Sequence, residues 1–575
     1  MSTTTGPAFS VREIPFSYAG SWFGISPVVA EKTYAEHLHL VSHQTGLHAV
    51  LRLVPTRSGA EAAAAVSASP SRLVWSGDDG QVELAYETVD TVRLRGHGLG
   101  LAISAADPAL TPFSGTYFYR DPVDGAHVFT DYGTGRRYRV TVLAGTAEAT
   151  GAQALGTGER GLAVAGDEPW EVSIEEFDSA RPPYRASCTF DEVVKAAEAE
   201  FTAFVDAVAP WRGPQTPAAE LAAYVLWSAT VRPAGFVTRP AVLMSKHWMD
   251  KVWSWDHCFN ALALADGRPE LAWHQFRIVF DHQDPAGALP DSITHSEVLY
   301  NFVKPPIHGW TLRQLRRRLP DLDVAELEAA YDALARWSTF WLDNRRGPGE
   351  ELPHYHHGND SGWDNATTFD HERVVQSADL AAFLVLQLHE LADLAKTLDR
   401  GGDAARWTAA AEQLCAAMLE RLWDGERFAA RSATTGHTRT SDSLLDLMAI
   451  ALGDGLPTQV RDTVAARIRR HLTAFGPATE LPTSPHYEAD GYWRGPIWAP
   501  STVLIEDGLR RAGHTDLADD ISARFRALCE QSGFAENFDA KTGAGLRDRA
   551  YTWTAAAYLI LAAAHTERIA PLPKT

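Results

Sequence analysis

The chain has 575 residues, more than one hydrophobic core usually serves, so its length predicts at least two domains. Its composition, 45% apolar and 22% charged, is that of an ordinary globular protein. The formal net charge of −21 opposes binding to a phosphate backbone, because such binding depends on lysine and arginine displacing counterions. We therefore expect no nucleic-acid partner.

The N-terminal sequence MSTTTGPAFSVREIPF has no basic start followed by an apolar run, and no stretch of 18 apolar residues occurs in the chain. We expect a soluble, cytoplasmic protein with no membrane partner. The four cysteines lie too far apart for the close pairs of a zinc site or a small disulfide framework: Cys188, Cys258, Cys415 and Cys529. This spacing predicts reduced, buried thiols. We also expect no metal and no cofactor.

Residues 1–180 consist of short segments rich in valine, leucine, tyrosine and threonine, separated by turn residues. Examples are HLHLVSHQTGLHAVLRLVP, SRLVWSGDDGQVELAYETV and DYGTGRRYRVTVLAG. Repeated strand, turn and strand at this spacing predicts an antiparallel, all-β sandwich. The paired prolines of SARPPYRAS then mark a linker, which we assign to residues 181–190.

Residues 191–575 change to alanine- and leucine-rich amphipathic segments, of the spacing that predicts about a dozen helices. Clear examples are DEVVKAAEAEFTAFVDAV, VAELEAAYDALARWSTFWLDN and QSADLAAFLVLQLHELADLAKTL. No fixed repeat period is found, which argues against a helical solenoid. Paired helices with long polar loops favour an all-α (α/α)6 barrel as the catalytic domain, its centre lined by helix ends and loops.

The first unusual loop, SKHWMDKVWSWDHCF, places Trp253, Trp255 and Asp256 directly before an apolar helix. An aspartate at this position is commonly an N-cap. Beside two tryptophans it would equally suit a pair of sugar hydroxyls, because a carboxylate accepts two hydrogen bonds. Both interpretations remain open.

The second loop, residues 281–310, contains prolines and glycines that exclude a helix across most of its length. A solvated loop would explain its charges but not its tryptophan. Its candidate ligand-binding residues are Gln283, Asp284, Asp291, Lys304, His308 and Trp310.

The third loop, YHHGNDSGWDNATTFD at 355–370, follows neither helical nor strand periodicity and contains Trp363, Asp364 and Asn365. The fourth region pairs YWRGPIW at 492–498 with GFAENFDAKTG at 533–543, which contains Glu536. Taken alone, Glu536 would be read as a solvent-facing turn residue.

These loops together resemble a known family. GNDSGWDNATTFD resembles the acid-bearing motif of glycoside hydrolase family 63 and of the related family 37 trehalases. WSWDHCF is similar to the tryptophan–aspartate element that binds sugar, and GALPDS with the following KPP is similar to a trehalase segment. YWRGPIW is similar to the aromatic–Arg–Gly–Pro element, and ENFDAKTG to the segment with the general base. The motifs occur in the same order, which makes the resemblance specific.

The resemblance implies that Asp364 is the general acid, Glu536 the general base, and that the anomeric configuration inverts. It implies that Asp256 and Trp255 hold the sugar in the subsite where cleavage occurs. Asp291 stands where trehalases have asparagine and Lys304 where they have arginine, which argues against a plain trehalase. The remaining substrate-binding candidates are Trp253, Gln283, Asp284, His308, Trp310, Trp363, Asn365, Tyr492, Trp493, Arg494 and Trp498.

We therefore expect a hydrolase of the α-glucosidic bond in a small carbohydrate, either a disaccharide or a glucosylglycerate-like compound. A glycerate carboxylate would require cations, for which Lys304, His308 and Arg494 are candidates. The alternatives are a trehalase-like or mannosylglycerate-type hydrolase, a sugar isomerase or epimerase that uses histidines for proton transfer, and a non-catalytic sugar-binding protein. The histidines beside the third loop lack the i, i+4 spacing of a zinc protease motif: His354, His356 and His357.

Overall fold

The computed structural model describes residues 6–151 and 155–570. The chain divides into two compact units. The first comprises Met1–Pro210, Ala223–Lys251 and Thr294–Ser296, and the second comprises Trp211–Ala222, Val252–Ile293 and Glu297–Thr575. Residues 1–5, on which the expectation of a cytoplasmic protein partly rests, lie outside the described residues. Among the described residues, no helix has both the length and the apolar character needed to cross a lipid bilayer.

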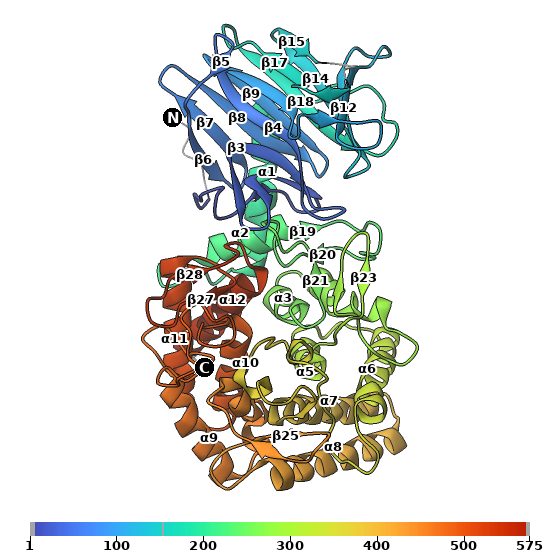
Figure 1. The fold of residues 1–575 in the computed structure, drawn as a ribbon, viewed down its shortest axis with the longest axis vertical. Coiled ribbons are helices and arrows are strands. Elements are labelled where there is room, and N and C mark those ends of the chain that lie inside the picture. The colour runs from blue at the N-terminus through green and yellow to red at the C-terminus, as the bar shows by residue number, and fades with distance from the viewer. Residues whose placement is uncertain (1–5, 152–154, 571–575) are drawn as a thin grey trace, which may run out of the picture. The chain divides into compact units, whose positions relative to one another are not determined.

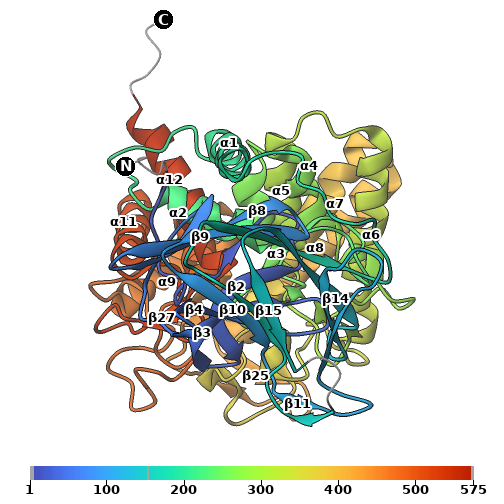
Figure 2. The same ribbon diagram turned by 90° about the horizontal axis from the view of Figure 1, so that it is seen from above.

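The first unit contains two large antiparallel sheets, of which one has the order β1-β2-β3-β4-β10-β17-β15, with β5 paired to β4. Figure 2 shows β2, β3, β4 and β10 of this sheet side by side. Its strands are β1 (Phe16–Ser17), β2 (Phe23–Ala30), β3 (Thr33–Ser42), β4 (His48–Arg57), β5 (Ala60–Glu61), β10 (Gly100–Ala105), β15 (Ala147–Thr150) and β17 (Gly161–Val164).

The other large sheet has the order β12-β13-β14-β18-β9-β8-β7-β6. Its strands are β6 (Ala65–Ser69), β7 (Arg72–Gly77), β8 (Gly80–Thr88), β9 (Thr91–His97), β12 (Thr116–Arg120), β13 (His127–Asp131), β14 (Arg136–Ala144) and β18 (Trp170–Phe177). Two further strand pairs are short: β11 (Ala109–Leu110) with β16 (Gly156–Thr157), and β19 (Thr230–Val231) with β20 (Ala241–Val242).

Side chains on the facing sides of the two large sheets are in contact. Tyr86 of β8 stacks on Phe23 of β2 with ring centroids 5.4 Å apart, and its hydroxyl donates to the Phe23 carbonyl at 2.9 Å. The predicted GDDG turn joins β7 to β8, where Gly77 pairs with Gly80. The prediction of a large antiparallel β region at the N-terminal end is confirmed.

Helix α1 (Phe190–Val208) begins with a capping box, in which Thr189 and Glu192 each accept a hydrogen bond from the other's backbone amide. Residues 181–187, inside the predicted linker, contain neither helix nor strand. Helix α1 packs on β8 and β9. It is followed by α2 (Ala219–Ala229).

The second unit is mainly helical (Figure 1). Its helices are α3 (His257–Leu264), α4 (Pro269–Arg277), α5 (His308–Arg318), α6 (Val324–Asn344), α7 (Ala378–Thr397), α8 (Gly401–Leu422), η4 (Leu444–Gly455), α9 (Thr458–His471), α10 (Ala499–Arg511), α11 (Thr515–Ser532) and α12 (Thr552–Ile569). The short elements of its loops are β21 (Val252–Trp253), η1 (Phe280–His282), β22 (Ser292–Ile293), β23 (Val298–Leu299), η2 (Gly358–Ser361), η3 (Thr367–Phe369), β24 (Val375–Gln376), β25 (Ala430–Ser432), β26 (Thr438–Arg439), β27 (Asn537–Phe538) and β28 (Gly545–Leu546).

These helices pack in a cyclic order. Helix α3 packs on α5, α5 on α7, α7 on η4, η4 on α10, α10 on α12, and α12 on α3 again. Each of the other helices of this unit contacts a member of the cycle: α4 contacts α3, α6 and α8 contact α7, α9 contacts η4, and α11 contacts α10. Close approach needs glycine at two crossings: a Cβ at Gly309 of α5 would collide with the Gln387 backbone of α7, and one at Gly508 of α10 with the Ile450 carbonyl of η4.

The prediction of a helical C-terminal region is confirmed, with two differences. His308 and Trp310, expected in an irregular loop, instead lie in the first turn of α5, which begins two residues after Pro306. The segment LLDLMAIALGDG forms η4, which the sequence did not predict. Its residues from Leu444 to Gly453 are all buried, so it lacks the one-sided apolar pattern that identifies a surface helix.

Candidate active site

The 355–370 loop turns at Gly362, whose φ of 72° lies in the left-handed region that favours glycine. A Cβ there would lie 2.6 Å from the Trp255 ring, so only glycine lets the loop rest on this tryptophan. The turn therefore joins the first and third predicted loops. It places Trp363 and Asp364 directly after the contact with Trp255.

Asp360 anchors the same loop from within. Its carboxylate accepts from Arg345 Nη1 at 2.7 Å, from the His356 backbone amide at 2.8 Å and from the Val303 backbone amide at 3.1 Å. The carboxylate is buried, and each of its two oxygens accepts at least one of these hydrogen bonds. Asp360 is thus a structural acid.

Asn365 joins the third loop to the YWRGPIW segment. Its amide nitrogen donates to the Gly491 carbonyl at 3.0 Å, and its amide oxygen accepts from the Trp493 backbone amide at 3.0 Å. Arg494 Nε donates to the Asn365 carbonyl at 2.7 Å, and the Arg494 guanidinium also pairs with Asp370. The two residues hold the loops together.

An aromatic cluster borders Asp364. The rings of Trp363 and Trp493 have centroids 4.5 Å apart, and Trp493 stacks on Trp498 at 4.1 Å with an angle of 5°. Trp255 lies 6.5 Å from Trp493 and 5.6 Å from Trp553. Such flat apolar faces suit the apolar face of a sugar ring.

The carboxyl group of Asp364 has a pKa raised above its ordinary value, chiefly because burial disfavours its charged form. The charge of Lys304 opposes this shift, and the charge of Asp291 adds to it. A raised pKa favours the protonated carboxyl that a proton donor requires.

Asp256 lies at the N-terminus of α3, but its side chain makes no capping hydrogen bond. The carboxyl is 3% exposed and its Oδ2 has no hydrogen-bond partner. Burial raises its pKa well above the ordinary value, and the charges of Asp291 and Asp364 raise it further. The capping interpretation therefore does not account for Asp256, whose free oxygen is available to a ligand.

Asp291 and Lys304 form a buried ion pair, with Asp291 Oδ1 3.2 Å from Lys304 Nζ. Lys304 Nζ also donates to the Asn359 carbonyl at 2.9 Å and lies 5.5 Å from the centre of the Trp253 ring. Its charge lowers the pKa of both Asp256 and Asp364. The second loop thus supplies the cation that faces the carboxyl groups.

Glu536 precedes strand β27, and its backbone amide donates to the Asp548 carbonyl at 2.7 Å. The side chain is 4% exposed. Burial, followed by the charge of Asp548, raises its pKa from 4.5 to about 8, against the opposing charge of Arg547. The reading of Glu536 as a solvent-facing turn residue does not fit this burial.

Tyr492 acts on both carboxyl groups. Its side chain lowers the pKa of Asp364 and of Glu536, which places it near the two acids. Its backbone has a φ of 64°, a strained conformation for a tyrosine. The Arg547 guanidinium lies over its ring at 4.9 Å. The structure therefore brings together two acids that are far apart in the sequence.

Other predicted residues have polar atoms engaged elsewhere. Gln283 Nε2 donates to the carbonyls of Gly287 at 2.9 Å and Ala333 at 3.0 Å, while Asp284 Oδ1 accepts from the Ala288 amide at 2.7 Å. Trp310 Nε1 donates to Asp507 Oδ2 at 2.9 Å. His308 is buried, and burial holds its pKa well below the ordinary value, so its ring is neutral.

Sequence reasoning missed the residues after the base-bearing turn. Asp548 is fully buried and acts on the pKa of Glu536, and Arg547 contacts Tyr492. Tyr551 has a pKa raised well above its ordinary value by burial and by the charge of Glu536. The sequence LRDRAYTW, with charges and aromatic residues just before α12, was the available signal.

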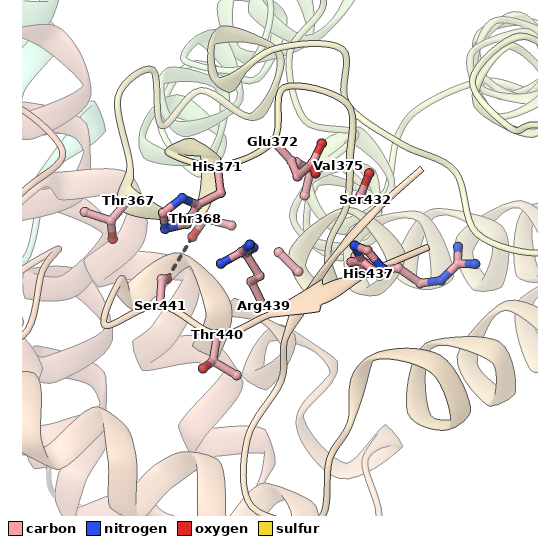
Figure 3. A pocket seen from close by; sticks show the side chains of 12 residues that line it. Thr367, Thr368, His371, Glu372, Val375, Ser432, His437, Arg439, Thr440 and Ser441 are labelled. Atoms are coloured by element: carbon pink, nitrogen blue, oxygen red, sulfur yellow. Dashed lines mark hydrogen bonds between the residues drawn. The ribbon is translucent and has the colours of Figure 1, made fainter. Parts of the chain in front are cut away.

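A small pocket opens beside the C-terminal end of the third loop (Figure 3). On one side the Thr368 and Ser441 hydroxyls are hydrogen-bonded at 3.2 Å. The pocket is lined by Thr367, Thr368, His371, Glu372, Val375, Ala430, Arg431, Ser432, His437, Arg439, Thr440 and Ser441. Arg431 is engaged with Glu350 at 2.9 Å.

Comparison with known proteins gives a consistent result. Residues 249–554 match the family model of the mannosylglycerate hydrolase MGH1-like glycoside hydrolase domain. A mannosylglycerate hydrolase from Rubrobacter radiotolerans is 25% identical over 419 residues, which cover 56% of this chain and 92% of that protein. A mannosylglycerate hydrolase from Thermus thermophilus is 26% identical over 389 residues, 53% of this chain and 92% of that protein.

Solved structures show the same fold. A family 63 mannosylglycerate hydrolase from a strain of Thermus thermophilus, in complex with glucose, aligns with a TM-score of 0.52 at 22% identity, over 60% of this chain and 99% of that one. Its complex with Tris and D-glycerate aligns with a TM-score of 0.51 over the same shares, also at 22% identity. The resemblance to family 63 that the motifs predict is confirmed.

Proposed function

The chain belongs to the mannosylglycerate hydrolase MGH1-like family of glycoside hydrolases, and from this premise we propose that it cleaves the α-glycosidic bond of a small hexoside with inversion. The observation that carries the proposal is that two carboxyl groups of raised pKa, the partly buried Asp364 and the buried Glu536, come from distant segments and are both acted on by Tyr492. Perturbed carboxyl groups that converge on one point are typical of catalytic sites.

Asp364 is the proposed general acid. Its carboxyl proton passes to the glycosidic oxygen as the bond from that oxygen to the anomeric carbon breaks, so the leaving group departs as a neutral alcohol. Burial supports this role because it favours the protonated form that must be present at the start of the step.

Glu536 is the proposed general base. Its carboxylate takes a proton from a water molecule whose oxygen attacks the anomeric carbon from the opposite face. Inversion requires room for this water molecule between the two carboxyl groups. With a pKa of about 8, Glu536 must lose its proton before it can act.

Asp256 and the tryptophans are the proposed sugar-binding groups. The unpartnered Oδ2 of Asp256 would accept a hydrogen bond from a sugar hydroxyl, and Trp255, Trp363 and Trp493 would pack on the apolar face of the ring. Asn365 and Arg494 would act by fixing the loops that carry these groups.

For the aglycone we propose glycerate, so that the substrate is a mannosylglycerate or a glucosylglycerate. The names of the relatives support this choice. The charge of Lys304 is the strongest influence that lowers the pKa of Asp256 and of Asp364. The same charge would attract the carboxylate of a glycerate. A disaccharide remains the second candidate from the sequence.

The same proposal includes the finer architecture. We assign residues 1–180 to a β-sandwich, 181–190 to a linker and 191–575 to a catalytic (α/α)6 barrel. The cyclic packing of the helices supports the barrel. A cytoplasmic location is supported by the free thiols of all four cysteines, since disulfides are rare in that compartment.

Proton NMR of the reaction tests the proposal directly. The full-length protein should release free hexose from mannosylglycerate or glucosylglycerate, and the first sugar to accumulate should be the β-anomer. Release of the α-anomer would contradict inversion. A mass-neutral change in a free sugar would instead favour the isomerase alternative, and absence of turnover on all α-hexosides would overturn the proposal.

A further inference from the structure

Three potential metal ligands meet behind the proposed sugar site. His257 and Cys258 begin α3, and His308 begins α5, which packs on α3. One ring nitrogen of each histidine and the cysteine sulfur all lie within 4.8 Å of one another. All three residues are fully buried. Neither the family assignment nor the proposed reaction gives this cluster a role.

The hydrogen bond of His257 fixes which nitrogen faces the cluster. Its Nδ1 lies 3.0 Å from the Trp253 carbonyl oxygen, which can only accept, so Nδ1 carries the hydrogen and donates it. The lone pair is therefore on Nε2, which lies 3.7 Å from Cys258 Sγ. Histidines that bind metals commonly have this arrangement, in which the far N–H donates to a backbone carbonyl.

His308 supplies a second, independent observation. Although the side chain is fully buried, neither ring nitrogen makes a hydrogen bond of standard geometry, and the Ser254 backbone is near enough only to oppose the lowering of its pKa. Its ring is packed beside Phe280 at 5.4 Å, His257 at 5.3 Å and Trp337 at 6.2 Å. A buried nitrogen without a hydrogen bond is destabilising, and a bond to a metal would remove that penalty.

We propose that His257 Nε2, Cys258 Sγ and a ring nitrogen of His308 form a binding site for a thiophilic transition-metal ion, with Zn²⁺ as the test ion. In tetrahedral zinc sites, bonds of about 2.0–2.3 Å place ligand atoms about 3.3–3.6 Å apart. The His257–Cys258 pair is already close to this separation, and His308 needs to approach by about 1 Å.

The ligand set selects the class of metal. Imidazole and thiolate favour Zn²⁺ or Cu⁺ over Mg²⁺ and Ca²⁺, which prefer oxygen ligands. On binding, the Cys258 thiol loses its proton to the solvent and the sulfur forms its bond to the metal as a thiolate, so binding should weaken as the pH falls. The ion would tie the start of α3 to the start of α5.

The test is zinc binding by the metal-free, untagged full-length protein, measured by competition with a fluorescent chelator. We expect one Zn²⁺ per chain in the wild type and at least tenfold weaker binding in Cys258→Ala. Cys529→Ala is the matched control, because Cys529 is also a buried free thiol but lies in α11. It should bind like the wild type. Equal binding by Cys258→Ala and the wild type would overturn the site, as would the absence of stoichiometric binding.

A second measurement does not depend on a variant that folds. Wild-type protein loaded with Co²⁺ should develop an intense thiolate-to-metal charge-transfer band, and Zn²⁺ should remove it by displacement. A Co²⁺ spectrum without that band would show that Cys258 is not a ligand. Neither readout requires sugar hydrolysis, so failure of the metal site and failure of the proposed function are distinguishable.

Discussion

Buried acids of the β-rich unit and of the helical unit can differ in whether they belong to an ion pair. In the β-rich unit, Glu175 is 2% exposed and pairs with Arg139 at 2.6 Å and with Arg181 at 3.2 Å. In the helical unit, Asp256, Asp364 and Glu536 belong to no ion pair within the described part of the chain. Burial raises the pKa of these three acids and of Glu175 alike, but only at Glu175 do bonded arginines, Arg139 and Arg181, oppose the shift.

The difference separates structural acids from acids that are free to react. A buried charge is costly unless it is paired, so an unpaired carboxyl stays neutral and retains its proton. Asp360 follows the structural pattern inside the loop that also contains Asp364, since it pairs with Arg345 at 2.7 Å. The distinction therefore depends on the partners of a residue and not on its unit or its loop.

The largest expected effect is on turnover. Asp364→Asn and Glu536→Gln should each lower kcat by at least about 10³-fold, because proton transfer at the leaving oxygen or at water is lost. Hydrolysis of the substrate identified by NMR would measure this. Asp321→Asn, at an exposed acid between α5 and α6, should keep most activity. Substantial residual turnover in either variant would refute its assigned role.

Breaking a structural pair should affect stability instead. Glu175→Gln leaves the buried Arg139 with one acidic partner fewer and should lower the free energy of unfolding by about 2–4 kcal/mol. Urea denaturation followed by circular dichroism would measure it. Turnover at a temperature where the variant is folded should be unchanged, and an unchanged urea midpoint would argue against the comparison.

Removing an unpaired acid should raise the free energy of unfolding instead of lowering it. The pKa of Glu536 is raised from 4.5 to about 8, so its contribution to stability is complete below pH 4.5 and is lost as the pH rises to 8. Glu536→Gln removes this loss and should be more stable than the wild type by about 1–3 kcal/mol at pH 8.5. Melting temperatures at pH 4.5 and 8.5 would measure the effect. A variant that is less stable at pH 8.5 would contradict it.

The smallest effect concerns the pH profile. The acidic limb of the profile of kcat/KM should lie near pH 8, the pKa of Glu536, and kcat/KM should fall about tenfold per pH unit below it because the base is then protonated. An ordinary glutamate would place the limb near 4.5. Rates from pH 4 to 10 at low substrate concentration would show it. A profile with both limbs below pH 6 would exclude the raised pKa in the free enzyme.

Much of the fold could be predicted because its patterns are local. Alternating strands and one-sided amphipathic helices leave a direct mark on the sequence, whereas η4 is buried on all sides and has no such pattern. The start of α5 was hidden by its prolines, which suit a helix start as well as a loop.

The site was partly predictable for a different reason. Sequence motifs singled out Asp364 and Glu536, but no local pattern indicates that Tyr492 reaches both or that Asp548 raises the pKa of Glu536. The ion pair of Asp291 with Lys304 and the cluster of His257, Cys258 and His308 likewise depend on contacts between separate segments. The spacing of the cysteines therefore could not reveal the proposed metal site.

The contact of Gly362 with the Trp255 ring has a consequence for how new specificities could arise. The loop that contains the proposed proton donor rests on a side chain of the proposed sugar-binding element. A substitution that reshapes one surface also displaces the other, so the two cannot be altered independently. Protein engineers who wish to change the accepted sugar should transplant the 253–256 and 358–365 segments together, as one inherited unit.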